Sequence, residues 1–181
     1  GKSMDFAKFD LVMKGLFSLE TGMESVKEIP VLCGTAEDLS GDNGLKALTV
    51  YLSAARHTRE IYAEKGIPDD VFWDTVKAFS RFVKEHKESN GTYGFDRHFW
   101  IYRQLSASLF RLGTLEFEMV SLPSDAPPVG DVPGGSPILS VHIPSDAVLT
   151  REALDASYAT ARKFFAEFFP DYRYRCVYCS S

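Results

Sequence analysis

The first half of the chain has the apolar spacing of α-helices. Apolar residues recur at every third or fourth position, so that they fall on one face of a helix. A basic last turn and a glycine end one such stretch at Lys65-Gly66, and Ser89-Asn90-Gly91 is a turn signal that ends the next. We expect a short amphipathic helix over residues 6–16, an irregular connector over 21–44, and helices over 45–65, 68–89 and 96–110.

The second half changes to the two-residue period of β-strands. Residues 111–121 and 137–143 alternate apolar and polar side chains, and a helix from Thr150 to Pro170 precedes a last strand over 172–179. A strand that is reached through a helix tends to run parallel to its neighbour. The predicted fold class is α+β, with an N-terminal layer of about four helices followed by a β-β-α-β unit that forms a small mixed sheet.

Two of the predicted strands carry polar residues suited to proton transfer. Alternation places Glu116 and Glu118 on one face of the first strand, and Ser140 and His142 on one face of the second. If the strands pair as a hairpin with their apolar faces on one side, two carboxylates and an imidazole share the other face. The sequence predicts no other convergence of such groups by geometry.

This polar face allows three interpretations: a proton-transfer site, a solvated face with an ordinary Glu–His pair, or a metal site. If both faces are covered, buried Glu116 and Glu118 need partners, for which Arg103 or Arg111 is the expected source. A metal site would use Glu116, Glu118 and His142 as ligands. Nothing else in the sequence favours a metal, and we expect none.

Composition and charge exclude several functions. The chain has 181 residues, 45% of them hydrophobic, which is enough for a packed core. A net charge of -5 argues against a nucleic-acid surface. We expect no membrane span, because the chain has no apolar run of about 18 residues. An odd number of cysteines, at positions 33, 176 and 179, argues against a disulfide framework and favours a reducing cytoplasm.

Four runs of the sequence are distinctive when taken together: Tyr62–Phe72, Phe110–Glu118, Val141–Pro144 and the terminal Cys179–Ser181. They resemble the C-terminal domain of bacterial GNAT-like acyltransferases. The resemblance covers about residues 45–181 and leaves residues 1–44 as a separate helix and connector. It implies a GNAT-like half-fold, acyl-CoA as the co-substrate, and an N-terminal acyltransferase-type domain outside this chain. The family's last motif continues as Cys-x-Ser-Trp-Leu-Leu, so we expect a truncated C-terminus.

The resemblance implies acyl transfer from a thioester to an amine or a similar small-molecule acceptor, with this chain as the substrate-binding or catalytic C-terminal half. The alternative is a non-catalytic domain that binds a ligand or a partner on a GNAT-like half-fold. One departure from the family concerns the coenzyme A pyrophosphate, which GNAT enzymes hold on an Arg/Gln-x-x-Gly-x-Gly/Ala loop that opens a helix. Here the glycine-rich run Val129–Gly135 contains Pro133, and no helix follows.

Acyl transfer needs a base for the amine proton and an acid for the thiolate. The candidate bases are Glu116, Glu118 and His142, and the candidate acids are Tyr178 and Tyr174. The candidate substrate-binding residues are Arg103, Arg111, Ser140, Tyr174 and Cys179. The Pro/Gly-rich segment 123–136 has two interpretations, a lid over this site or an exposed insertion.

Overall fold

A computed structural model describes residues 43–179. The chain divides into two compact units. The helical unit comprises residues 1–64 and 76–107, and the sheet unit comprises residues 65–75 and 108–181. The helix predicted over residues 6–16, nearly all of the connector predicted over 21–44, and Cys33 lie outside the described residues.

Three helices form the described part of the helical unit: α4 (Leu45–Lys65), α6 (Ala78–Asn90) and α7 (His98–Leu105). Their inward faces share one apolar core, and α6 ends as predicted at Gly91, whose left-handed backbone lets its N–H bond to the Lys87 carbonyl. No helix among residues 43–179 is long and apolar enough to cross a membrane. The core residues are Ala47, Tyr51, Ala54, Ala78, Phe79, Phe82, Phe95, Ile101, Tyr102 and Leu105.

Two of the predicted helix boundaries were wrong. The helix predicted over 68–89 is two helices, α5 (Asp69–Val76) and α6, separated only at Lys77. Lys77 keeps near-helical dihedrals (φ -55°, ψ -16°), so the apolar period continues across the break and conceals it. The helix predicted over 96–110 stops at Leu105, because Ala107 takes a positive φ of 52° that ends the helical course.

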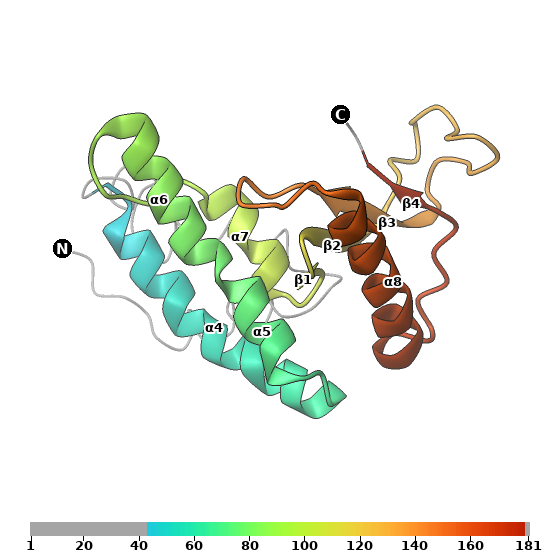
Figure 1. Cartoon of the computed structure of the whole chain (residues 1–181), viewed down its shortest axis with the longest axis horizontal. Coiled ribbons are helices and arrows are strands. Elements are labelled where there is room, and N and C mark those ends of the chain that lie inside the picture. The colour runs from blue at the N-terminus through green and yellow to red at the C-terminus, as the bar shows by residue number, and fades with distance from the viewer. Residues whose placement is uncertain (1–42, 180–181) are drawn as a thin grey trace. The chain divides into compact units, whose positions relative to one another are not determined.

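The sheet unit has four strands in the spatial order β1-β2-β3-β4, as Figure 1 shows. They are β1 (Leu109–Leu112), β2 (Leu115–Ser121), β3 (Pro137–His142) and β4 (Val177–Tyr178), with α8 (Arg151–Phe168) between the last two. The first two pairs are antiparallel and β3 pairs with β4 in parallel, which confirms the α+β class, the mixed sheet and the parallel last strand.

The strand predicted over 111–121 is in fact a hairpin of two strands. Leu112 pairs with Leu115, so Gly113 and Thr114 form a two-residue loop. Gly113 has a φ of +74°, which suits the first loop position of a type II′ turn. The final strand predicted over 172–179 is also shorter, since only Val177 and Tyr178 pair with β3.

Helix α8 packs its aromatic face on the sheet. It begins at the predicted cap, where the Thr150 side chain accepts a hydrogen bond from the Ala153 N–H. The Phe110 ring of β1 lies 4.8 Å from the Phe164 ring, centroid to centroid. Tyr158 of the same helix is 40% exposed. The residues that α8 buries are Ser157, Ala161, Phe164 and Phe165.

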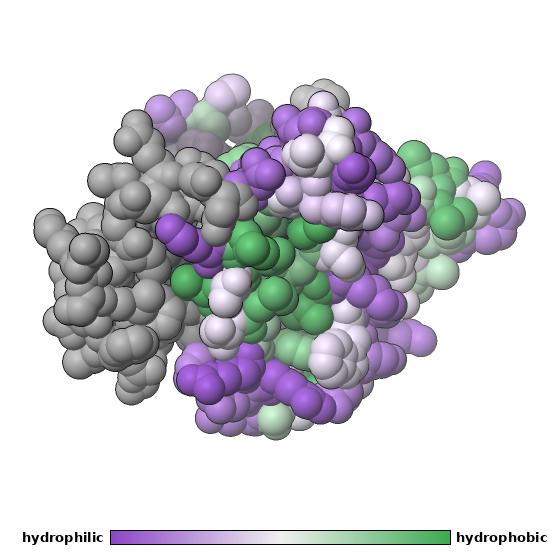
Figure 2. All heavy atoms as spheres, turned by 90° about the vertical axis from the view of Figure 1, so that its left-hand side faces the viewer, coloured by the Kyte–Doolittle hydropathy of each residue, from purple (hydrophilic) through white to green (hydrophobic). Residues whose placement is uncertain are grey.

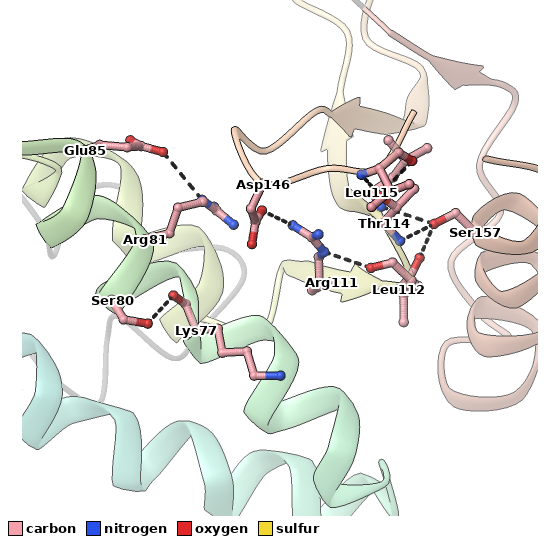
Figure 3. Close-up of polar contacts among 12 residues, drawn as sticks. Lys77, Ser80, Arg81, Glu85, Arg111, Leu112, Thr114, Leu115, Asp146 and Ser157 are labelled. Atoms are coloured by element: carbon pink, nitrogen blue, oxygen red, sulfur yellow. Dashed lines mark hydrogen bonds and ion pairs between the residues drawn. The ribbon is translucent and has the colours of Figure 1, made fainter. Parts of the chain in front are cut away.

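Ser157 joins α8 to the β1–β2 turn (Figure 3). Its buried hydroxyl donates to the Leu112 carbonyl over 2.5 Å and accepts from the N–H groups of Thr114 (2.8 Å) and Leu115 (3.1 Å). A Cβ at Gly113 would lie 2.7 Å from the Ser157 oxygen, so only glycine leaves room for this contact. One hydroxyl thus satisfies three backbone groups of the turn.

We expect Ser157→Ala to destabilise the chain by about 2–4 kcal/mol, because it leaves two amides and a carbonyl unsatisfied in a buried turn. Urea unfolding would measure this loss. The matched control is Thr160→Ala, on an exposed position of the same helix, which should change little. Equal losses in the two variants would contradict the role of the Ser157 hydroxyl.

Candidate active site

The register of β2 and β3 confirms the predicted shared face. Glu116 lies directly opposite His142, and Glu118 directly opposite Ser140. Side chains of opposed residues project to the same side of a sheet. All four therefore lie on the face opposite that of Phe117 and its register partner Val141.

His142 and Glu118 form a hydrogen bond across the two strands. The Nε2 atom of His142 lies 2.8 Å from the Oε2 atom of Glu118. The pair is diagonal, since each residue is two positions from the other's register partner. The two carboxylate residues are shielded from water, since Glu116 is 2% exposed and Glu118 8% exposed, while the His142 side chain is 21% exposed. The solvated-face interpretation is therefore wrong for the two carboxylates.

The outer strands extend this face. Arg111 of β1 lies opposite Glu116, and Tyr178 of β4 lies opposite Ser140. The Arg111 guanidinium donates to the Gly113 carbonyl over 2.8 Å and to Asp146 Oδ1 over 2.9 Å (Figure 3). The sheet thus brings together six of the nine predicted site residues, from all four strands.

Three other predicted residues lie elsewhere. The Tyr174 ring packs edge-on against Phe165 of α8, with 6.3 Å between centroids. Cys179 is exposed and lies just after the end of β4. Arg103 belongs to the helical unit, where its guanidinium lies 4.1 Å from the Trp100 ring centroid. Their substrate-binding roles stay predictions.

Tyr172 is a neighbour of the site that the sequence did not reveal. Its hydroxyl lies 2.9 Å from the Val120 carbonyl and 2.7 Å from the Ile138 carbonyl, which are opposed on β2 and β3. Burial raises the pKa of Tyr172 to about 12, and the negative charge of Glu118 acts in the same direction. The sequence places Tyr172 soon after Pro170, at the start of the strand predicted over 172–179. Tyr172 lies outside the observed strands, and no periodic pattern predicts the contacts of its hydroxyl.

The structure also bears on metal and phosphate. Among residues 43–179, no group of three or more His, Cys, Asp or Glu residues is placed to hold a metal ion, so Glu116, Glu118 and His142 do not form such a group.

The glycine-rich run over residues 129–135 forms a small loop closed by a single bridge between Val129 and Val132. A strand, β3, follows it rather than a helix, so this loop offers no helix N-terminus to an anion.

Two family models match the chain in succession. The N-acyltransferase N-terminal domain matches residues 9–107, and the GNAT-like C-terminal domain matches residues 109–181. The N-terminal domain that was expected outside this chain therefore has a match within it. No curated protein matches the chain.

Several solved acyltransferases share the fold. One in complex with decanoyl-CoA and teicoplanin is 31% identical, with a TM-score of 0.67, over 75% of this chain and 39% of that one. Another in complex with CoA and 10C-teicoplanin is 32% identical, with a TM-score of 0.64, over 73% and 38%. A mutant in complex with octanoyl-CoA gives the same four values. The chain thus spans about two fifths of the length of these relatives. It belongs to the GNAT-like N-acyltransferases, with the N-terminal domain of that family followed by its GNAT-like C-terminal domain.

Proposed function

We propose that this chain binds acyl-CoA and takes part in transferring the acyl group from the thioester to an amine or a similar acceptor. The observation that carries the proposal is the His142–Glu118 pair, which lies beside Glu116 on a shielded face of the GNAT-like domain. Family membership supports the reaction class. The ligands of the solved relatives, decanoyl-CoA, octanoyl-CoA and CoA, support a thioester with a medium-length acyl chain.

The hydrogen bond to Glu118 favours the tautomer in which His142 can act as a base. An ionised carboxylate only accepts hydrogen bonds, so the Nε2 atom of His142 carries the proton of this contact. In a neutral imidazole the lone pair is then on Nδ1. Glu118 would fix the tautomer and the orientation of the ring, and would stabilise the imidazolium after the Nδ1 atom takes a proton. Glu116, opposite His142, adds a second negative charge in support of that imidazolium.

The bond changes of the proposed reaction balance without a metal. The acceptor nitrogen attacks the thioester carbonyl carbon, its proton passes to His142 Nδ1, and collapse of the intermediate breaks the carbon–sulfur bond. The CoA thiolate then takes a proton, for which Tyr178 on β4 is the candidate donor because it lies on the same face. Tyr172 is a poor donor by comparison, because its pKa of about 12 keeps the hydroxyl protonated.

The proposed setting is a reducing compartment such as the cytoplasm. Both described cysteines, Cys176 and Cys179, are free thiols, which suits that setting. The proposed partners are small molecules only, and the net charge of -5 argues against a nucleic-acid role.

We expect His142→Ala to lower kcat by about 10²–10⁴-fold, the usual contribution of a general base. The measurement is CoA release from decanoyl-CoA with a panel of primary amines, detected with a thiol reagent. Glu118→Gln should lower kcat in the same direction, because the amide no longer holds the imidazole in the basic tautomer. Binding of decanoyl-CoA, followed by calorimetry, should survive both changes.

The matched control is His57→Ala. His57 pairs with Glu60 at 3.1 Å on the surface of α4, so it is the same chemical pair outside the site. It should leave kcat unchanged. Turnover that survives in His142→Ala would remove His142 from the reaction. Binding of decanoyl-CoA without turnover in any protein, wild type included, would favour the non-catalytic ligand-binding alternative, and failure of the wild type to bind any acyl-CoA would overturn the proposal.

The pH dependence of Tyr172 is a separate prediction. Its folded-state pKa of about 12 exceeds the ordinary value of about 10, so the stability it contributes is full below about pH 10 and is lost as the pH rises through 12. NMR of ring-labelled tyrosine should show a Tyr172 resonance with a midpoint near 12. That resonance should vanish in Tyr172→Phe and persist in Tyr178→Phe. A Tyr172 midpoint near the ordinary value would contradict the burial of its hydroxyl.

A further inference from the structure

The loop over residues 143–149, which connects β3 to α8, carries an unusual concentration of exposed aliphatic side chains. Ile143 is 54% exposed, Val148 58% and Leu149 59%. We refer to these three side chains as the aliphatic loop surface. The loop begins at the residue after His142 and ends where Thr150 caps α8.

This loop is fixed rather than loose. The Val148 N–H donates to the Thr114 hydroxyl oxygen over 2.6 Å, and that hydroxyl donates to the Val148 carbonyl over 3.1 Å. Asp146 is held by Arg111 at 2.9 Å (Figure 3). The Ala147 N–H bonds to the Pro144 carbonyl. The three side chains are exposed although the backbone that carries them is held in place. Exposed apolar side chains that lie together among polar residues mark ligand-binding sites.

We infer that the aliphatic loop surface binds the acyl chain of the co-substrate, an extended aliphatic chain of medium length. This inference rests on the proposed function. The thioester carbon must reach His142, and this loop begins at the next residue. The loop is also tied through Asp146 to Arg111, which lies opposite Glu116 on the polar face, so an acyl chain that leaves the reaction centre on this side meets the loop. The polar face itself is lined by Glu116 and Glu118, which disfavour an aliphatic chain.

The size of the surface favours an acyl chain over a protein partner. A stable protein interface buries about 800 Å² on each partner. Three side chains on one short loop provide far less than that, but they match a narrow ligand that is apolar along its whole length.

A second exposed apolar group lies on the helical unit, where Leu45 is 58% exposed and Leu52 49% exposed on α4. Figure 2 views the side of the molecule on which Figure 1 labels α4 and α6, and it shows apolar side chains gathered near the centre of that view.

The test is a chain-length series. Calorimetry would give the affinities of the whole chain for CoA, butyryl-CoA, octanoyl-CoA and decanoyl-CoA. In the wild type each added methylene should raise the affinity by up to about fourfold, the value for full burial of a methylene. The double variant Val148→Ser, Leu149→Ser should lower the gain from butyryl-CoA to decanoyl-CoA at least tenfold and leave binding of CoA unchanged.

The matched control is the double variant Leu45→Ser, Leu52→Ser, which removes two equally exposed aliphatic side chains from α4. It should keep the wild-type gain. All four positions are exposed, so thermal unfolding should verify that both variants fold. An unchanged gain in the loop variant, or no gain in the wild type, would overturn the acyl-chain site while leaving the His142 proposal standing. Failure of every acyl-CoA to bind would overturn the proposed function itself. A wild-type dimer, seen by light scattering and dissociated by the loop variant, would instead make the loop a contact between copies.

Discussion

The register between β2 and β3 is the constraint on which the site depends. It places Glu116 opposite His142 and brings Glu118 within 2.8 Å of the same imidazole. A slip of one residue would turn each of these side chains to the other face of the sheet, because the side-chain period of a strand is two. The apolar partners Phe117 and Val141 oppose such a slip, since it would move them out of the aromatic core beside α8. Packing on one face therefore fixes the chemistry on the other.

Burial of the polar face has an electrostatic cost that the structure offsets locally. A buried carboxylate is costly unless it is paired and hydrogen-bonded. His142 provides that partner for Glu118 at the point where the two strands already meet. Removal of one member of such a pair leaves the other charge uncompensated, so the pair is a stability element as well as a candidate catalytic one. The contact that keeps Glu118 tolerable inside the protein therefore also holds the imidazole ring of His142 in place.

The sequence predicted this face because strand alternation is a strong signal. It did not predict the element boundaries where a short turn leaves the alternation or the helical period intact. Gly113 and Thr114 reverse the chain with two residues, which is too short a gap to interrupt a run of apolar positions. Leu109 and Phe110 continued the spacing of the preceding helix, although they belong to β1. Tyr172 and Ser157 could not be predicted, because their roles depend on carbonyl and amide groups far away in sequence. Alternation identifies faces, but tertiary hydrogen bonds decide which polar residues on or near a face matter.

The connection from β3 to α8 changes chemical character within a few residues. Ser140 and His142 present polar groups from the strand, whereas Ile143, Val148 and Leu149 expose aliphatic side chains from the loop. Helix starts of this kind hold phosphate through backbone N–H groups in many nucleotide-binding folds. Here the Thr150 side chain caps α8 and accepts a hydrogen bond from the Ala153 N–H, so that donor already has a partner. The anchors from Thr114 and Arg111 hold the loop in place beside the strand that carries His142. A charged headgroup and an aliphatic tail need different surroundings, and in the acyl-chain site that we propose this connection would meet the tail.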